Sequence, residues 1–376
     1  MRRTLAIARK EALHLLRDPR SLAAAIAVPI GMLLLYGYAV NYDLKHLTFA
    51  IVDQDRTPTS RRIVEAVDAI DGFDCVAVLP SARPAEVVFE REQAMAIVVI
   101  PPGLEDDLAH GRSASIQVLI DGSNSTMAAV GTAYCRSAIE TAGFRLAREQ
   151  LRVLGYPESL LRPSIDVRHR VLYNPDLKTQ VFLIPGLIGI ILMLMSALLT
   201  SGIVVRERER GSFELLAASP VSSREIIIGK LLPYLLLATF DVVLVVGAGW
   251  VVFGVEPKGD LGVLLLVSTV YVGCALALGL LFSCVAKTQQ LAMMLAFITT
   301  VLPTMLLSGF AFPVRNMPLV LRCISAVLPA THYIALMRGI VLKGTGLASM
   351  PDHFAALLAI TLVLVVLSVR RFRKTL

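Results

Sequence analysis

The stretch from Val181 to Val205, VFLIPGLIGIILMLMSALLTSGIVV, carries no charged residue. The stretch that follows, RERERGSFELLAASPVSSRE (206–225), begins with five charged residues in a row. A helix needs about 20 apolar residues to cross the hydrocarbon of a bilayer. The first stretch is therefore predicted to span a membrane, and the charged run to mark where the chain leaves it.

The composition of the whole chain also indicates a membrane protein. Of its 376 residues 56% are hydrophobic and 17% charged, and its mean hydropathy is +0.70. These values disfavour a soluble globular protein. With 6% aromatic residues and no basic stripe, the sequence also disfavours a nucleic-acid binder.

Counting runs of this kind predicts an α-helical polytopic membrane protein with six transmembrane helices and an inserted α/β extracytoplasmic domain. The predicted segments are a cytoplasmic amphipathic connecting helix (1–20), the first transmembrane helix (21–41), the inserted domain (42–178), the second transmembrane helix (179–205), a cytoplasmic coupling loop (206–225), further transmembrane helices (226–253, 261–286 and 288–312), a re-entrant hairpin region (313–345), the last transmembrane helix (352–370) and a cytoplasmic tail (371–376).

The inserted domain has the composition of a water-soluble protein. Its β-rich runs at 47–52, 73–78, 94–100, 115–120 and 165–172 alternate with helical stretches, which favours an α/β or α+β fold. It holds two cysteines, Cys75 and Cys135. They could form a disulfide, but no wider cysteine framework supports one.

Charge placement predicts the orientation. Sixteen of the 36 Lys and Arg residues fall on the side of the N-terminal segment, and five fall in the short loops opposite. Basic residues next to transmembrane helices stay in the cytoplasm, whereas long domains cross regardless of charge. Both termini are therefore expected inside and the insertion outside.

The segment before the first transmembrane helix has an amphipathic pattern. Leu5, Ala8, Ala12, Leu15 and Leu16 share one helical face, which predicts an interfacial helix on the cytoplasmic membrane surface. A plain basic anchor would need the charges but not the apolar stripe.

The loop at 206–225 is longer than a simple connection requires. Gly211 breaks the preceding helix, a short helix can run over 212–218, and Ser219-Pro220 stops it. Ser222 and Glu225 then form a capping box for the next helix. A short helix held between two membrane helices suits a partner with a groove, although a simple surface helix is the alternative.

Two features of the membrane part stand out. Asp241 lies within a predicted transmembrane helix, where an ionisable group is costly; it either serves a transport path or is a protonated Asp bonded to a neighbouring helix. Between Pro318 and Pro329, the apolar run 319–328 is too short to span, which predicts a re-entrant or interfacial hairpin.

Several sequence motifs are absent. The sequence has no G-x-x-x-x-G-K-[ST] phosphate loop, no H-E-x-x-H and no G-x-S-x-G, and no Cys/His spacing typical of zinc. We therefore expect no catalytic residue, no metal site and no cofactor bound by this chain.

Taken together, the segments resemble the permease subunits of type-2 ABC exporters, the ABC-2 membrane family, in the subset with a large extracytoplasmic domain between the first two transmembrane helices. The motifs that carry the resemblance are Arg206 to Tyr234, with Gly211, Glu214, Ser219-Pro220 and Gly229-Lys230, then Tyr173-Asn174-Pro175 followed by Phe182 to Gly189, and finally Leu306 to Pro318 and Pro329 to Gly339.

The resemblance implies that a separate P-loop ATP-binding subunit, carrying ATP and Mg, grips the N-terminal helix and the helix at 212–218. The residues implied in docking are Arg9, Lys10, Glu207, Glu209, Gly211, Phe213, Glu214, Leu215, Leu216, Ser219 and Pro220. It also implies a second permease subunit, identical or sister, paired through the first and fifth transmembrane helices, and a pathway lined by the second and fifth. The pathway candidates are Asp241, Phe182, Pro185, Met193, Pro303 and Phe310.

The expected function is therefore export of a hydrophobic or amphipathic substrate, drug-like or lipid-like, across a bacterial inner membrane, with a periplasmic adaptor as a further candidate partner. One alternative is a membrane-anchored extracytoplasmic ligand-sensing or envelope-assembly protein, for which Asp241 would be dispensable. Another is an ion-coupled secondary transporter with Asp241 as a proton relay. The lack of a visible internal repeat weighs against it.

Overall fold

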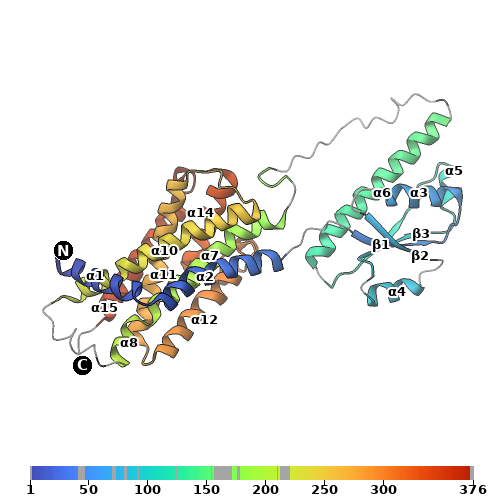
Figure 1. The fold of residues 1–376 in the computed structure, drawn as a ribbon. Coiled ribbons are helices and arrows are strands. Elements are labelled where there is room, and N and C mark those ends of the chain that lie inside the picture. The colour runs from blue at the N-terminus through green and yellow to red at the C-terminus, as the bar shows by residue number, and fades with distance from the viewer. Residues whose placement is uncertain are drawn as a thin grey trace. The chain divides into compact units, whose positions relative to one another are not determined.

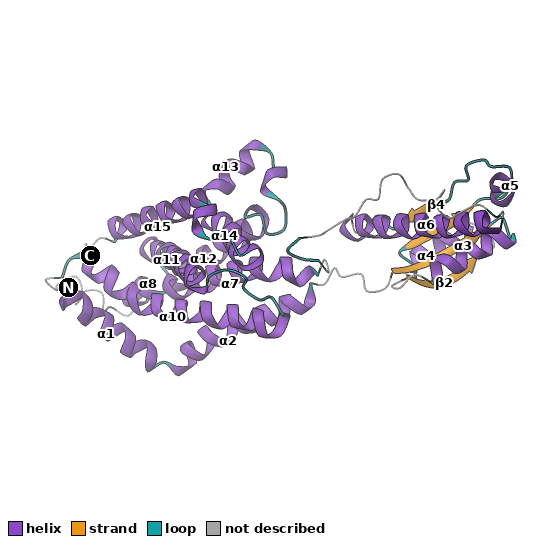
Figure 2. Ribbon diagram, turned by 90° about the horizontal axis from the view of Figure 1, so that it is seen from above, coloured by secondary structure: helices purple, strands orange, loops and turns teal. Residues whose placement is uncertain are grey.

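The computed structural model describes residues 2–40, 47–69, 73–79, 83–91, 93–123, 125–153, 155, 172–175, 178–209, 211 and 221–372. The chain divides into two compact units. One combines Met1–Asn41 with Arg170–Leu376, and the other is Tyr42–His169. The first unit is helical, and the described strands all belong to the second (Figure 2). An α-helical polytopic membrane protein with an inserted α/β region is thereby confirmed as the fold class.

The helical unit contains six helices long and apolar enough to cross a membrane among the described residues. They are α2 (Pro19–Ala39), α7 (Thr179–Ser201) continued by α8 (Ile203–Glu209), α10 (Ser223–Phe253), α11 (Leu261–Val285), α12 (Gln289–Leu307) and α15 (Pro351–Arg371). A shorter helix, α1 (Arg2–Leu16), precedes them. Both ends of the chain lie at the same end of this helical bundle (Figure 1).

α7 is the central helix of the bundle. It packs against α2, α10, α11, α12 and a further helix, α14 (Pro329–Lys343), and most of its side chains are buried. The approach of α11 is closest at Gly279, where a Cβ would overlap the carbonyl of Ala197, so only glycine fits there. Thr200 Oγ1 on α7 donates to the Leu276 carbonyl of α11 over 2.8 Å. A hydrogen bond of this kind between apolar helices fixes their register.

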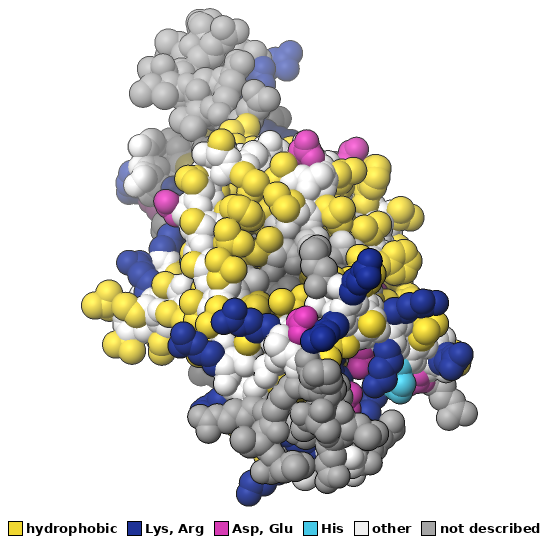
Figure 3. All heavy atoms as spheres, turned by 90° about the vertical axis from the view of Figure 1, so that its left-hand side faces the viewer, with side chains coloured by type: hydrophobic (Ala, Val, Ile, Leu, Met, Phe, Trp, Pro, Cys, Tyr) yellow, Lys and Arg dark blue, Asp and Glu magenta, His cyan; other side chains and the backbone are white. Residues whose placement is uncertain are grey.

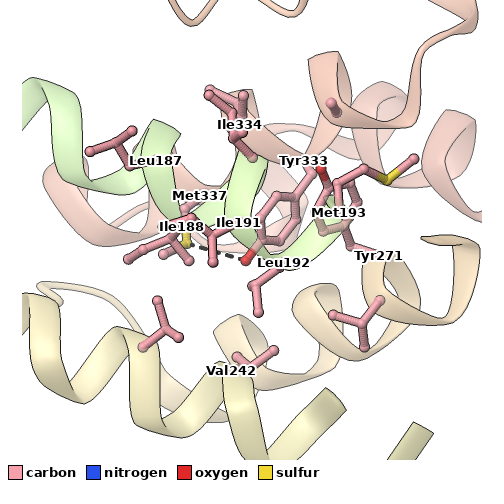
Figure 4. Packing of buried hydrophobic residues seen from close by; sticks show 14 of the residues in the cluster. Leu187, Ile188, Ile191, Leu192, Met193, Val242, Tyr271, Tyr333, Ile334 and Met337 are labelled. Carbon is pink, nitrogen blue, oxygen red and sulfur yellow. Dashed lines mark hydrogen bonds between the residues drawn. The ribbon is translucent and has the colours of Figure 1, made fainter. Parts of the chain in front are cut away.

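Two stacked tyrosines lie inside this bundle. The Tyr271 ring of α11 and the Tyr333 ring of α14 are 3.9 Å apart between centroids and nearly parallel. The Tyr271 hydroxyl donates to the Gly189 carbonyl of α7 over 2.8 Å, and the Tyr333 hydroxyl lies 3.7 Å from the Met337 sulfur (Figure 4). Both buried hydroxyls are thus satisfied, which lets the aromatic pair join α7, α11 and α14.

The region after α12 is built from two short helices joined at a sharp bend. α13 (Leu319–Val327) and α14 (Pro329–Lys343) meet at an 80° angle at Leu328, as a broken membrane span or a re-entrant loop would. Pro329 begins α14 and cannot continue the helix before it. Between α12 and α13 the chain forms a short 3₁₀ turn, η2 (Val314–Asn316), and a second one, η3 (Leu347–Ser349), precedes α15.

Two predicted segment ends differ in the structure. The helix predicted over 288–312 ends at Leu307, because Gly309 takes a positive φ of 84° that a helix cannot accommodate. The helix predicted to stop at residue 205 continues as α8 to Glu209 after a break at Gly202. The break is stabilised by Ser283 Oγ, which accepts from the backbone N–H groups of Val204 and Val205 over 2.9 and 3.2 Å.

The inserted unit is a four-stranded mixed sheet of order β2-β1-β3-β4, in which only β3 and β4 are antiparallel. Its elements in chain order are β1 (Leu47–Asp53), α3 (Pro58–Asp68), β2 (Phe73–Leu79), α4 (Arg83–Glu90), β3 (Ala96–Ile100), α5 (Leu104–Ala109), β4 (Gln117–Ile120) and α6 (Ser125–Val153). The predicted strand over 165–172 falls outside the described residues, except for Leu172, which is not in a strand.

Side-chain alternation along β1 and β3 builds two small cores. Phe49, Ile51 and Val98 face α3 and α6, whereas Ala50, Val52 and Ile97 face the side covered by α4 (Figure 1). Cys135 lies in the first core, and both it and Cys75 are free thiols, so the disulfide that the sequence left open is not formed.

Candidate functional site

The base of α10 holds a buried ion cluster that joins three helices. The Lys230 ammonium lies 2.9 Å from Glu11 Oε1 of α1 and 2.6 Å from Glu207 Oε1 of α8. Lys230 is 1% exposed and Glu11 8% exposed. Burial of an unpaired charge costs several kcal/mol, so each of these groups depends on the others being in place. The cluster therefore ties α1, α8 and α10 together.

A glycine lets α1 approach α10 closely enough for this pairing. A Cβ at Gly229 would lie 2.8 Å from the Thr4 carbonyl oxygen and 2.9 Å from Ile7 Cβ, closer than real Cβ atoms come. Any larger residue would push α1 away from α10. Gly229 thus lets α1 approach α10 closely, and Lys230 provides the cation that pairs with Glu11 of α1.

The buried face of α1 differs from the predicted apolar stripe. Leu5 and Leu16 are 69% and 65% exposed, whereas Ala8 and Glu11 are buried. α1 turns toward α10 the face that carries the Glu11 carboxylate, which leaves these two leucines uncovered by the rest of the chain, and the predicted membrane-facing stripe stays a prediction. Charge pairing with Lys230, not apolar matching alone, sets the rotation of the helix.

α8 is held on its other side by α11 and α12. Glu209 Oε1 accepts from the backbone N–H of Gln289 over 2.8 Å, at the N-terminus of α12, where a negative charge is favoured. Arg208 donates to the Cys284 carbonyl over 3.2 Å. α8 is thus held by α10, α11 and α12 at once.

That loop is described only at its two ends. Gly211 has a φ of 70°, the left-handed conformation that ends a helix, as the sequence predicts. At the far end, Ser222 and Glu225 form the predicted capping box that starts α10. The predicted docking residues Phe213, Glu214, Leu215, Leu216, Ser219 and Pro220 lie outside the described residues. Arg9 and Lys10 are exposed on α1.

The predicted pathway residues do not form one group. Phe182 and Phe310 come together at the end of α7 away from both chain ends, where the Arg338 guanidinium lies 4.0 Å from the Phe182 ring and donates to the Gly309 carbonyl over 2.9 Å. Phe310 packs against Gly186, next to the buried Pro185. Met193 is buried in the core of the bundle (Figure 4). Pro303 is a half-buried proline farther back along α12.

Asp241 stands apart from these residues. It lies on α10, is 4% exposed, and its Oδ1 has no hydrogen-bond partner among the described residues. The sequence left open an Asp bonded to a neighbouring helix, and Oδ1 forms no such hydrogen bond within the described part of the chain. Groups of three or more metal-ligating side chains are also absent from the described part of the chain.

Sequence reasoning missed the ion cluster and the tyrosine pair. Glu11 and Lys230 are 219 residues apart, and in the sequence Glu11 is one more charge on the polar face of a basic helix. Lys230 carried a signal that could have been used, since a cation one turn inside a predicted transmembrane helix needs a partner. Tyr271 and Tyr333 carried no such signal.

Comparison with known proteins identifies this architecture. Residues 20–370 match the model of the ABC-2 family transporter proteins, and the chain belongs to that family. It is an ABC transporter permease of the multi-pass membrane type.

Among its relatives are two proteins of Escherichia coli K12, each 29% identical, described as the probable multidrug ABC transporter permeases YbhS and YbhR. The alignment with YbhS covers 91% of this chain and 89% of the relative, and that with YbhR covers 94% and 93%. The inner membrane transport permease YhhJ of the same organism is 27% identical over 87% of this chain and 85% of its own.

Proposed function

We propose that this chain is the permease subunit of an ATP-driven exporter. It moves a hydrophobic or amphipathic substrate, drug-like or lipid-like, out of the cytoplasm or the inner leaflet. Energy comes from a separate P-loop subunit that carries ATP and Mg. Family membership and the description of YbhS and YbhR as probable multidrug ABC transporter permeases support this proposal.

The observation that carries the proposal is the ion cluster of Glu11, Glu207 and Lys230. It joins α1 to the helices on both sides of the loop at 210–220, so that a force on α1 or on the loop reaches α10 and α8 together. This is the mechanical connection that an exporter powered from outside its own chain requires. A ligand sensor has no need of it.

The docking surface we propose has two parts. Arg9 and Lys10 present charge on the exposed side of α1. The second part is the loop, with Phe213, Glu214, Leu215, Leu216, Ser219 and Pro220 as the contacts. Glu207 and Glu209 contribute indirectly: they bind Lys230 and the N-terminus of α12, and so fix α8, from which the docking loop follows.

We propose that a second permease subunit, identical or sister, covers α2 and α12. Both helices keep wide apolar faces uncovered within this chain, including Leu35 and Tyr36 on α2 and Phe297 and Leu302 on α12. Substrate would pass along α7 and α12, with Phe182, Pro185, Met193, Pro303 and Phe310 as the candidate contacts, and with Asp241 of α10 as a separate candidate.

The membrane proposed is the bacterial inner membrane, with both termini in the cytoplasm. The charge asymmetry of the loops supports this orientation, and both chain ends lie at one end of the bundle (Figure 1). The inserted unit would then be extracytoplasmic, where a periplasmic adaptor could reach it.

Co-purification from a mild detergent tests the proposal. We expect the full chain to retain a P-loop ATPase near one to one. A variant lacking residues 212–220 should lose that subunit but still insert in the membrane. The matched control, Arg370→Ala with Arg371→Ala, changes two exposed cations of α15 and should retain it. A wild-type chain purified without any ATPase would contradict the proposal and favour the ligand-sensing alternative.

A further inference from the structure

A large groove runs beside α1 at the end of the bundle that holds both chain ends. Its volume is about 880 Å³. Five Lys or Arg side chains line it against one acidic residue, Asp18; the five are Arg2, Arg9, Lys10, Arg17 and Arg206. Basic side chains gather on this end of the unit, next to hydrophobic ones (Figure 3). The groove therefore has the charge that suits an anion.

A second cavity of about 370 Å³ lies next to this groove. The two cavities share the lining residues His14, Asp18 and Arg206. Beyond them the lining of the second cavity is almost wholly apolar and comes from α1, α2, α7, α10 and α12; its main members are Ala24, Val28, Met195, Leu198, Leu199 and Met293. We call this second cavity the crevice.

The groove is polar and the crevice apolar, which is the order in which a headgroup and its acyl chain follow each other in a leaflet. The crevice lies between helices long and apolar enough to span, and the groove lies beside α1 and the charged α8. An amphiphile of the leaflet that faces α1 would place its polar head in the groove and its tail in the crevice.

Two cations are available to a ligand: Arg17, which lines the groove, and Arg206, which lines both the groove and the crevice. Arg17 and Arg206 form no ion pair with any residue that the structure describes, whereas Lys230, a short distance away, is enclosed by two carboxylates. Arg206 borders the groove, the crevice and the small cavity of the ion cluster alike. A guanidinium in such a place favours carboxylate or phosphate ligands, which it can bind through two N–H groups.

We infer that the groove and the crevice together form an access site for an anionic amphiphile of the inner leaflet, with its headgroup on Arg17 and Arg206 and its tail in the crevice. The inference names the substrate class and rests on the proposed function. The exporter takes up acidic amphiphiles in preference to cationic ones.

Two fluorescent probes of equal tail length test the charge preference: a dodecanoic acid and a dodecyl trimethylammonium, each carrying the same uncharged dye. The full chain is placed in nanodiscs of phosphatidylcholine. We expect the acid to bind about ten-fold more tightly than the ammonium, since a charge-assisted pair contributes on the order of a ten-fold change or more. Equal binding of both probes would overturn the inference.

Matched variants locate the site. Arg17→Gln with Arg206→Gln should remove the preference for the acid, whereas Arg370→Gln with Arg371→Gln, on the same end but outside both cavities, should keep it. Val28→Trp fills the crevice and should weaken both probes, while Val366→Trp, 48% exposed on α15, should weaken neither. The site is overturned if the acid is still preferred in the Arg17→Gln and Arg206→Gln variant, or if Val28→Trp leaves the binding of both probes unchanged.

ATP separates a transported amphiphile from a permanently bound lipid. In the complex with its ATPase, ATP should release the bound acid, and the acid should stimulate hydrolysis. Retention through turnover overturns the access role. If no ATPase co-purifies with the chain but the acid still binds more tightly than the ammonium, the proposed function is wrong while the binding site stands. If the ATPase accompanies it and the preference is absent, the site fails alone.

Discussion

Lys230 shows, for a single residue, how a charge can be buried near the end of a membrane-spanning helix. Lys230 and Glu11 are withdrawn from water there, and Glu207 is partly so, and charge pairing offsets the loss of hydration. The Lys230 ammonium has both carboxylates within 2.9 Å. Removing Lys230 would leave two carboxylates without their cation, whereas removing either glutamate would leave Lys230 paired with the other one.

We expect Lys230→Met to destabilise the chain by about 3–5 kcal/mol, because Glu11 and Glu207 would then be left buried without their cation. Thermal unfolding of the purified protein in detergent measures it. The companion variant Lys230→Met with Glu11→Gln and Glu207→Gln removes all three charges and should regain most of the loss. No recovery in that variant would mean that pairing is not what the site depends on.

Gly229→Ala should separate α1 from α10, because its new Cβ meets the Thr4 carbonyl at 2.8 Å. Hydrogen exchange should then increase over α1. The control is Gly247→Ala on the same helix, where no atom lies within 4 Å of the added Cβ. That change should be neutral or mildly stabilising, because alanine favours helix. Equal exchange in both variants would contradict the close approach.

Single residues also mark the limit of sequence reasoning. The capping box at Ser222 and Glu225 and the helix end at Gly211 are local signals, and both were predicted. The partner of Lys230 is not local, since Glu11 lies 219 residues away. The same holds for the Tyr271–Tyr333 stack, which depends on how α11 and α14 meet. Tertiary contacts of this kind leave no periodic trace in the sequence.

At the scale of elements, the inserted unit uses a carboxylate in place of a local cap. Asp55, after β1, accepts from the backbone N–H groups of Gly103, Leu104 and Glu105 at the start of α5. Burial tends to raise the pKa of Asp55, but these bonds and the Thr57 hydroxyl outweigh it and hold the pKa below its usual 3.8. The contact fixes α5 to the end of the sheet.

A pKa lowered in the folded state stabilises the fold above the unfolded value and ceases to do so as pH falls through the folded value. The protection of α5 amides should therefore be full above about pH 4 and decline in more acid solution. Asp55→Asn should weaken α5 at neutral pH by about 1–3 kcal/mol and flatten this pH dependence. Hydrogen exchange of the full chain at several pH values measures both; identical profiles would contradict the role of Asp55.

Among the elements, those with long or regular patterns were the predictable ones. The six apolar runs became six candidate membrane-crossing helices, and four of the five β-rich runs became β1 to β4. The face that α1 turns toward α10 was not predictable, because an amphipathic pattern says which face is apolar and not which partner the polar edge meets. The order of the strands in the sheet likewise depends on contacts far apart in sequence.

At the scale of the whole molecule, orientation in the membrane is the property that the proposed function needs most. Cys323 on α13 is exposed, whereas Cys135, Cys274 and Cys284 are buried. Burial also raises the pKa of the Cys135 thiol to about 11, which keeps it protonated and unreactive at neutral pH. Cys323 is therefore a natural reporter of the end opposite α1.

We expect a membrane-impermeant maleimide to label Cys323 in spheroplasts, in a variant that keeps only this cysteine. The control places a single cysteine at Arg3→Cys on α1, which should react only after the cells are permeabilised. Labelling quantified on a gel gives the result. The reverse pattern would place the termini outside and exclude docking of a cytoplasmic ATPase on α1.

The most direct test of the central claim is ATP hydrolysis by this chain, reconstituted in lipid alone and together with the P-loop subunit that co-purifies with it. The account predicts no hydrolysis above background from the chain alone. It predicts clear turnover from the pair, at a rate that Lys230→Met lowers, since that change breaks the connection between α1, α8 and α10. Hydrolysis by the chain alone would contradict the account. So would a pair that hydrolyses ATP at the same rate with Lys230→Met as with the wild-type chain.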